Sequence, residues 1–292
     1  SPGLSNSYLL TTGDGRVVVN TGMGFEGPVH RANFDAVDSS PVRYVIFTQG
    51  HVDHVGGLDS VRDPDTLVVA QSNWTTWRDD NERLIPYRAN RSAFAFQEKL
   101  ATGIRAIQQR LGATGLAGQS VPRVDIDFED TLTLQVGWRQ MELIAVPGGE
   151  TTDSLVVWLP DERICLCGNT FGPIFGHIPN LVTMRGDRYR DALTAIDSIE
   201  RVRALQPDLL VTGHFTTFIT ALAALSEIVP FHAVYRRMDN PVLEQQLYQR
   251  GTRKFPIALI HRKEIRRMLQ ELGDRGVVAI LPDQDFGLNR GV

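Results

Sequence analysis

Short runs of apolar residues separated by polar turns characterise the first 220 or so residues of the chain. Tyr8-Leu9-Leu10 and Val17-Val18-Val19 flank the turn Gly13-Asp14-Gly15 and predict a β-hairpin. Further strands are expected at the apolar or alternating runs 42–48, 66–70, 131–136, 141–146, 154–159, 163–167 and 209–212. Strands come first, followed by helices that flank more strands. This order predicts an α/β (α+β) protein with two sheets packed together and helices outside.

Helical spacing of apolar and charged residues predicts helices at 96–111 and 187–205. Residues 72–100 mix tryptophans and other aromatic residues with arginines. Two interpretations of that segment stay open: an irregular helical excursion on the surface, or the wall or lid of a substrate pocket. The tail predicts a helix, a strand, a helix and a strand at 241–250, 258–260, 264–272 and 277–281. Such a small piece cannot bury a core alone, so we expect it to dock on the main domain or on a partner chain, for example in a homodimer.

Composition excludes several classes of protein. The chain has 292 residues, 42% of them hydrophobic and 22% charged, which is typical of a globular protein of one large or two smaller domains. The net charge of −4 argues against a nucleic-acid or membrane-surface partner, and no run of about 18 apolar residues predicts a membrane span. Cys165 and Cys167 stand too close together to bridge, so we expect two packed thiols. The chain starts at Ser1, which leaves open a removed leader and the compartment.

Residues 48–54, Thr-Gln-Gly-His-Val-Asp-His, carry the strongest chemical signal in the chain. Two imidazoles and a carboxylate follow an apolar strand within four positions, as in a metal-binding turn. Three further polar elements lie next to predicted strands, namely 147–150 (Pro-Gly-Gly-Glu), Gly168-Asn169 and Gly213-His214. Side chains at such junctions can converge at one edge of the sheets. The sequence therefore predicts a metal site there.

This pattern resembles the metallo-β-lactamase superfamily over about residues 5 to 220. The resemblance implies a four-layer αββα sandwich with one or two zinc ions held by loops at one edge. The family's HxHxDH motif normally begins with histidine, where this chain has Gln49. By resemblance, a first metal site uses positions 49 and 51 (Gln49 and His51) and a later histidine or glutamate, and a second uses Asp53, His54 and His214. An acidic residue near Asn169 normally bridges the two.

Within the superfamily, the chain is most similar to the alkyl-sulfatase branch. Glu150 places a carboxylate where most relatives have a histidine, as the alkyl sulfatases do. The stretch 180–186 (Asn-Leu-Val-Thr-Met-Arg-Gly), followed by Arg190-Asp191-Ala192, looks like that branch's sulfate-binding segment. Asn180 and Arg185 would then hold the anionic group of the substrate, and a guanidinium fork suits a tetrahedral oxyanion.

The tail, about residues 230 to 292, resembles instead a fragment of the bacterial lipid A acyltransferases. The likeness is carried by Val234-Tyr235-Arg236, Asp239-Asn240-Pro241 and the stretch 281–287. That family's catalytic His-x4-Asp has no counterpart in the tail. We therefore expect a hydrolase domain at 1–225 and a short, non-catalytic α/β appendage at 226–292.

Three departures from the family pattern point the same way. Gln49 replaces a histidine ligand, Asn169 (or Gly168, if the alignment slips by one) replaces an acidic bridge, and Asn20 replaces a supporting aspartate. Amide oxygens are weaker zinc donors than imidazole and carry no charge. We therefore predict one tightly held Zn²⁺ at Asp53, His54 and His214, with the second ion weak or absent and manganese or iron not excluded. One dication beside one carboxylate leaves a local charge of about +1, which favours an anionic substrate.

These observations predict a hydrolase that attacks a small anionic sulfate ester with metal-activated water. Asp53 would orient the water. Glu150 would serve either as a metal ligand or as the general base, and the sequence does not decide between these two roles of Glu150. Two alternatives remain: a lactam, lactone or carboxyl-ester hydrolase with the same metal site, and a metal-depleted binding protein without catalysis.

Overall fold

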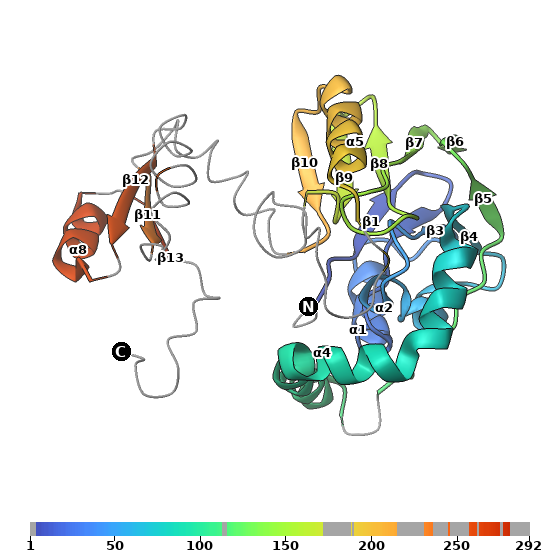
Figure 1. Ribbon diagram of the computed structural model, residues 1–292, viewed down its shortest axis with the longest axis horizontal. Coiled ribbons are helices and arrows are strands. Elements are labelled where there is room, and N and C mark those ends of the chain that lie inside the picture. The colour runs from blue at the N-terminus through green and yellow to red at the C-terminus, as the bar shows by residue number, and fades with distance from the viewer. Residues whose placement is uncertain are drawn as a thin grey trace. The chain divides into compact units, whose positions relative to one another are not determined.

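The computed structural model describes residues 4–112, 116–171, 188, 190–214, 231–235, 245, 257–261, 263–274 and 277–280. The chain divides into two compact units, Ser1–Thr217 and Phe218–Val292 (Figure 1). The domain boundary expected between residues 225 and 226 lies outside the described residues, so it stays a prediction.

The first unit opens with a five-stranded sheet in the order β1-β2-β3-β4-β5. Its strands are β1 (Tyr8–Thr11), β2 (Arg16–Val19), β3 (Val42–Ile46), β4 (Leu67–Gln71) and β5 (Ile126–Phe128). β1 and β2 form the predicted antiparallel hairpin, and the later neighbours pair in parallel. The predicted strands are confirmed within one or two residues, whereas β5 was not predicted because three residues give too short a pattern.

A second five-stranded sheet has the order β10-β9-β8-β7-β6. Its strands are β6 (Thr131–Val136), β7 (Arg139–Ala145), β8 (Leu155–Leu159), β9 (Ile164–Gly168) and β10 (Leu209–Thr212), all at predicted positions. Alternate residues of β8 show how the sheet is buried on both faces. Leu155 and Val157 join the core between the two sheets, while Val156 and Trp158 point to the opposite face.

Helices cover the outer face of each sheet, which gives the expected αββα order of layers (Figure 1). The short helices α1 (Gly27–Asp35), α2 (Val52–Val55) and α3 (Leu58–Val61) pack on the first sheet. α5 (Ala192–Ala204) packs on the second sheet through Val202, against a layer that contains Cys165 and Cys167. Both cysteines are free and buried, as predicted.

Residues 74–111 correct the sequence prediction. The sequence left open an irregular helical excursion or a pocket wall at 72–100 and predicted a separate helix from residue 96. The structure has a single helix, α4 (Trp74–Leu111), of 38 residues with Pro86 inside it. Trp74 and Ile107 near its ends are buried, whereas Ile85 is 51% exposed. Among the side chains of α4 that the structure describes, the buried ones lie near its two ends, so they form no continuous apolar stripe. Because proline also usually ends a helix, the sequence pattern was misread.

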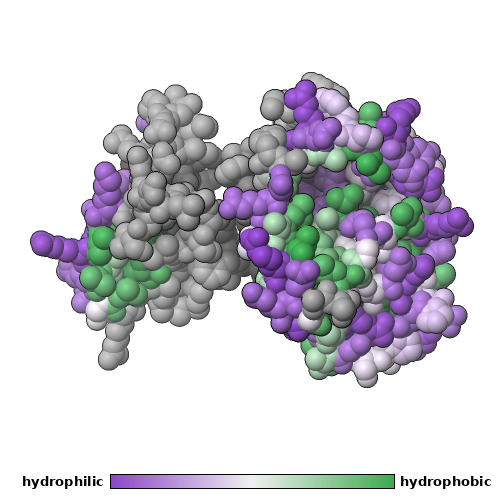
Figure 2. Space-filling model, turned by 90° about the horizontal axis from the view of Figure 1, so that it is seen from below, coloured by the Kyte–Doolittle hydropathy of each residue, from purple (hydrophilic) through white to green (hydrophobic). Residues whose placement is uncertain are grey.

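The second unit contains a parallel three-stranded sheet in the order β12-β11-β13. It comprises β11 (Phe231–Tyr235), β12 (Ile257–His261), β13 (Val277–Ile280) and the helix α8 (Ile265–Gly273). The last two predicted strands and the helix between them are confirmed; the helix predicted at 241–250 lies outside the described residues. Figure 2 shows apolar and hydrophilic surface side by side on this unit. Among the helices in the described part of the chain, none is both long and apolar enough to cross a membrane.

Candidate metal centre

Four strand ends meet at one edge of the two sheets and carry the polar residues singled out in the sequence. β3 leads into residues 48–54, β7 into 147–150, β9 into Asn169 and β10 into His214. Backbone hydrogen bonds tie these loops together: Leu155 N donates to Thr48 O at 2.9 Å, and Gly213 N donates to Gly168 O at 2.7 Å. The first bond fastens the metal-binding turn to the start of β8 in the other sheet, and the second joins the end of β9 to the loop that follows β10.

Asn20 anchors the start of the metal-binding turn. Its backbone adopts a left-handed conformation (φ 61°), which asparagine tolerates better than most residues. Its side-chain oxygen accepts from Thr48 N at 3.0 Å, and its amide donates to Thr48 Oγ1 at 3.0 Å. Asn20 is 1% exposed, so these bonds satisfy a fully buried amide and fix the position from which the turn departs.

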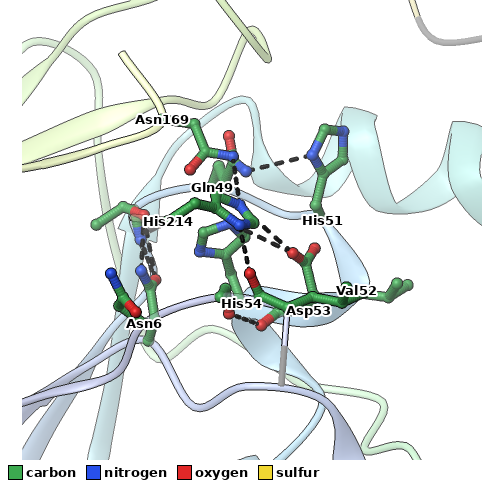
Figure 3. A network of polar contacts seen from close by, with 12 residues as sticks. Asn6, Gln49, His51, Val52, Asp53, His54, Asn169 and His214 are labelled. Carbon is green, nitrogen blue, oxygen red and sulfur yellow. Dashed lines mark hydrogen bonds and ion pairs between the residues drawn. The ribbon is translucent and has the colours of Figure 1, made fainter. Parts of the chain in front are cut away.

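Asp53, His54 and His214 form one group, here called the Asp53 cluster, whose ligand atoms lie within 4.8 Å of one another. Figure 3 shows the three side chains turned toward a common point. Asp53 Oδ2 lies 3.6 Å from His214 Nε2 and 3.9 Å from His54 Nε2. One carboxylate and two imidazoles form a donor set that suits a divalent zinc ion and leaves a coordination position open.

His214 presents a defined nitrogen to this cluster. Its Nδ1 is hydrogen-bonded to the carbonyl oxygen of Leu4, which can only accept, so Nδ1 carries the proton. In the neutral ring Nε2 then keeps its lone pair, and it faces Asp53 and the amide of Asn169, 3.2 Å away. The Oδ1 atom of Asn169 is buried without a hydrogen-bond partner among the described residues.

The protonation states of the cluster favour metal binding. Burial lowers the pKa of His54 to about 4, so the imidazole is neutral near neutrality. Burial acts to raise the pKa of Asp53, but the nearby histidines outweigh it and the net shift is downward, toward the carboxylate. Both ring nitrogens of His54 are buried and accept or donate no hydrogen bond within the described structure. A bound cation would satisfy one of them, so these residues fit a metal ion.

A second group, here called the Glu150 cluster, consists of Gln49, His51, Glu150 and Arg190. His51 Nδ1 lies 3.2 Å from Gln49 Nε2 and 3.3 Å from Glu150 Oε1. The structure thus brings together the residues expected at the first metal site. Arg190, however, donates to both oxygens of Glu150, at 2.9 and 3.2 Å. Two uncharged ligands and a carboxylate already paired with a guanidinium fit a second metal ion poorly.

Two residues beside the site received no role in the sequence analysis. Asp153 was not singled out, and Arg190 was noted only as part of the segment that resembles the sulfate-binding stretch. Asp153 is 1% exposed, and burial raises its pKa to about 6. Its Oδ2 would lie 3.0 Å from a Cβ atom at Gly50, so the carboxyl group lies directly against the metal-binding turn. The available signal was its position, three residues after Glu150 and just before a buried strand. The contact between Arg190 and Glu150 was harder to predict, since no feature of the sequence indicates that these two residues lie together.

Trp77 supports the pocket-wall interpretation of the aromatic segment. Its ring lies edge-on to His51, with ring centroids 5.7 Å apart, and it lines a small hollow with Glu150, Arg188 and Arg190. The predicted substrate-binding residues Asn180 and Arg185 lie outside the described residues.

Comparison with known families gives two matches. A family model described as the metallo-beta-lactamase superfamily matches residues 1–214. A second, described as bacterial lipid A biosynthesis acyltransferase, matches residues 156–292 and overlaps the first over β8 to β10. Both resemblances seen in the sequence are thereby confirmed, although the second reaches further upstream than the tail.

Two curated proteins are similar in sequence. A linear primary-alkylsulfatase from Pseudomonas sp. (strain ATCC 19151) is 26% identical over 217 residues, which cover 70% of this chain and 40% of that protein. The beta-lactamase-like protein 2 homolog of Caenorhabditis elegans is 24% identical over 243 residues, covering 82% of this chain and 66% of that protein. The chain thus spans less than two thirds of the length of either relative.

Solved structures support the fold. A stereoselective inverting sec-alkylsulfatase from Pseudomonas sp. superimposes with a TM-score of 0.59 at 19% identity, over 73% of this chain and 36% of that one. The BLEG-1 B3 metallo-beta-lactamase gives a TM-score of 0.50 at 18% identity, over 74% of this chain and 88% of that one. At such low identities these likenesses establish the architecture alone.

Proposed function

Since the chain belongs to the metallo-beta-lactamase superfamily, we propose that it is a metal-dependent hydrolase acting on a small anionic sulfate ester. The observation that carries the proposal is the Asp53 cluster. Three ligand atoms converge within 4.8 Å at an edge where loops of both sheets meet, and His54 keeps two buried ring nitrogens without a hydrogen-bond partner in the described structure. Such an arrangement is costly in a fold unless a ligand satisfies it.

Asp53, His54 and His214 would hold one divalent ion, with zinc favoured by the nitrogen-rich donor set and manganese or iron as alternatives. A bound ion of this kind lowers the pKa of water to about 7 and polarises an ester oxygen. The protein's own residues would position the metal ligands and the attacking water. The Leu4 carbonyl fixes the tautomer of His214. The half-buried Asp53 carboxylate, whose pKa is lowered, would accept a hydrogen bond from the attacking water and orient it.

The sulfate-ester substrate is supported by two observations. The first is the similarity to a linear primary-alkylsulfatase, at 26% identity over 70% of the chain. The second is the charge of the site, since one dication beside Asp53 leaves about one net positive charge to attract an anion. We assign Asn180 and Arg185 to the anionic group, as the sequence predicts, and residues 226–292 to a non-catalytic appendage that supplies packing or dimer contacts.

Hydrolysis of a lactam, lactone or carboxyl ester is the second candidate function. It uses the same metal site, and the match of residues 1–214 to the metallo-beta-lactamase superfamily model favours it. A non-catalytic binding protein is the third candidate, favoured by the amides Gln49 and Asn169 at positions where the family has metal ligands.

Metal analysis combined with a substrate screen tests the proposal. Purified protein should retain zinc, manganese or iron and should hydrolyse alkyl sulfates faster than phosphate esters, carboxyl esters or lactams. Arg185→Ala should abolish sulfatase turnover while sparing lactam or ester turnover. An unchanged sulfatase rate in that variant would contradict the assignment of a sulfate-ester substrate. Protein that holds no metal and gains no activity from added metal would favour the binding-protein alternative.

A further inference from the structure

Arg190 and Glu150 form a buried, bidentate ion pair. Its Nη1 donates to Oε2 at 2.9 Å and its Nη2 donates to Oε1 at 3.2 Å. Arg190 is 4% exposed and Glu150 is 3% exposed, so water does not compete for either charge. The parallel fork of a guanidinium matches both oxygens of a carboxylate, which makes this one of the stronger side-chain contacts available to a protein.

The fold holds Arg190 in this position. Gly148 has a φ of +100°, and a Cβ atom there would lie 2.7 Å from the backbone nitrogen of Ala195 in α5. Glycine therefore lets the first turn of α5 sit directly on the loop that leads to Glu150. Arg190 stands two residues before α5 and Glu150 two residues after Gly148, so this close approach puts the two side chains opposite each other.

The consequence is a difference in charge between the two clusters. In the Asp53 cluster, the carboxylate is paired only with histidines among the described residues. In the Glu150 cluster, the carboxylate is already neutralised by a fixed cation, and Gln49 contributes no charge. A second divalent ion at the Glu150 cluster would have to bind beside a guanidinium attached to its own ligand, and like charges at such short range repel strongly in a buried site.

We propose that Arg190 stands in for the second metal ion of the superfamily, so that the centre works with a single ion in the Asp53 cluster. This inference rests on the proposed function, because it presupposes an ion at Asp53, His54 and His214. Glu150 then holds His51 and Arg190 in place, and it is neither a strong metal ligand nor the general base. Arg190 is a positioning residue, since it acts through Glu150.

A cobalt titration tests the role of Arg190. Gln49→His supplies the missing imidazole, and we compare it with the double variant Gln49→His/Arg190→Gln. The second Co²⁺ should bind at least about tenfold more tightly to the double variant, because the repelling charge is gone. Gln49→His/Arg190→Lys keeps the charge and should match Gln49→His. Equal affinity for the second ion in all three proteins overturns the inference.

A second measurement needs no variant and stays decisive if loss of the buried arginine prevents folding. Wild-type protein dialysed against excess Co²⁺ should retain one ion per chain and give the electron paramagnetic resonance signal of an isolated ion. Two retained, spin-coupled ions would overturn the role of Arg190 while leaving the proposed hydrolase intact. Protein that retains no ion would overturn the proposed function and this inference together.

Discussion

His214 donates a hydrogen bond from Nδ1 to the main-chain carbonyl of Leu4, 210 residues earlier in the chain. Asn6 reinforces the contact, since its backbone N donates to Gly213 O at 2.7 Å and its amide donates to Thr212 O at 3.1 Å. The N-terminal segment thus fixes the orientation and the tautomer of a candidate metal ligand. Partners that hold the far nitrogen of a ligating histidine commonly change metal affinity by 10- to 100-fold.

Deletion of residues 1–6 should therefore weaken binding at the Asp53 cluster by roughly 10- to 100-fold, because the Leu4 carbonyl and both Asn6 contacts are lost. Competition with a chromophoric zinc chelator measures the affinity. Deletion of residues 1–3 is the matched control, since Leu4 and Asn6 remain, and its affinity should equal that of the full chain. Equal losses in both deletions would show that the carbonyl has no such role.

Removal of the metal should lower thermal stability, because an ion that binds only the folded state stabilises it. At a free zinc concentration 100 times the dissociation constant, the gain is about 2.7 kcal/mol. Scanning calorimetry of chelator-treated protein, with and without added zinc, measures this gain. His54→Ala removes a fully buried ligand and should abolish the zinc-dependent rise in melting temperature. His261→Gln, a change in the second unit, should leave it intact; a zinc response surviving in His54→Ala would exclude His54 as a ligand.

The sandwich fold and the metal-binding turn were predictable because their signals are local. Alternating apolar residues define each strand, and His51, Asp53 and His54 stand within four positions directly after one of them. His214 lies far along the chain, yet it too follows a strand directly, and strand ends of packed sheets gather at shared edges. A pattern of residues at strand ends thus predicted that Asp53, His54 and His214 lie close together, as they do in the structure. Their role as metal ligands stays a prediction.

The pairing of Arg190 with Glu150 was not predictable in this way. It depends on the approach of α5 to the loop at Gly148, a close contact between two segments that no local pattern encodes. The extent of α4 was mispredicted for a related reason, since the helix continues through Pro86, where the local sequence favours an end, and Trp74 and Ile107 near its two ends are buried. Tertiary contacts overrode local preference in both cases.

Protonation of His30 should make the fold sensitive to mild acid. Burial lowers the pKa of His30 to about 4, and its Nε2 lies 3.9 Å from Glu26. In the unfolded chain the pKa is about 6.5, so the unfolded state takes up the proton first. Stability is therefore fully present above pH 6.5 and falls as the pH decreases from 6.5 to 4, by up to about 3 kcal/mol.

Urea denaturation at several pH values measures this effect, with His30→Gln as the comparison. The glutamine variant should lose less stability than wild type between pH 6.5 and 4, and the two should change in parallel above pH 7. The same slope in both proteins across the acid window would mean that His30 does not carry the sensitivity.

Gly50 stands between Gln49 and His51, where the chain has no room for a side chain. A Cβ atom there would lie 2.4 Å from Cε3 of Trp77, which is 7% exposed and packed against its neighbours. Gly50→Ala should therefore destabilise the fold by about 2 kcal/mol, as overpacked substitutions do, and should displace the turn that carries His51 and Asp53. Gly118→Ala is the control, because nothing lies within 4 Å of the added carbon, and its stability should change by less than about 0.5 kcal/mol. The denaturation midpoint and the zinc affinity are measured for both variants. If Gly50→Ala has the same midpoint and the same zinc affinity as Gly118→Ala, the turn does not depend on contact with Trp77.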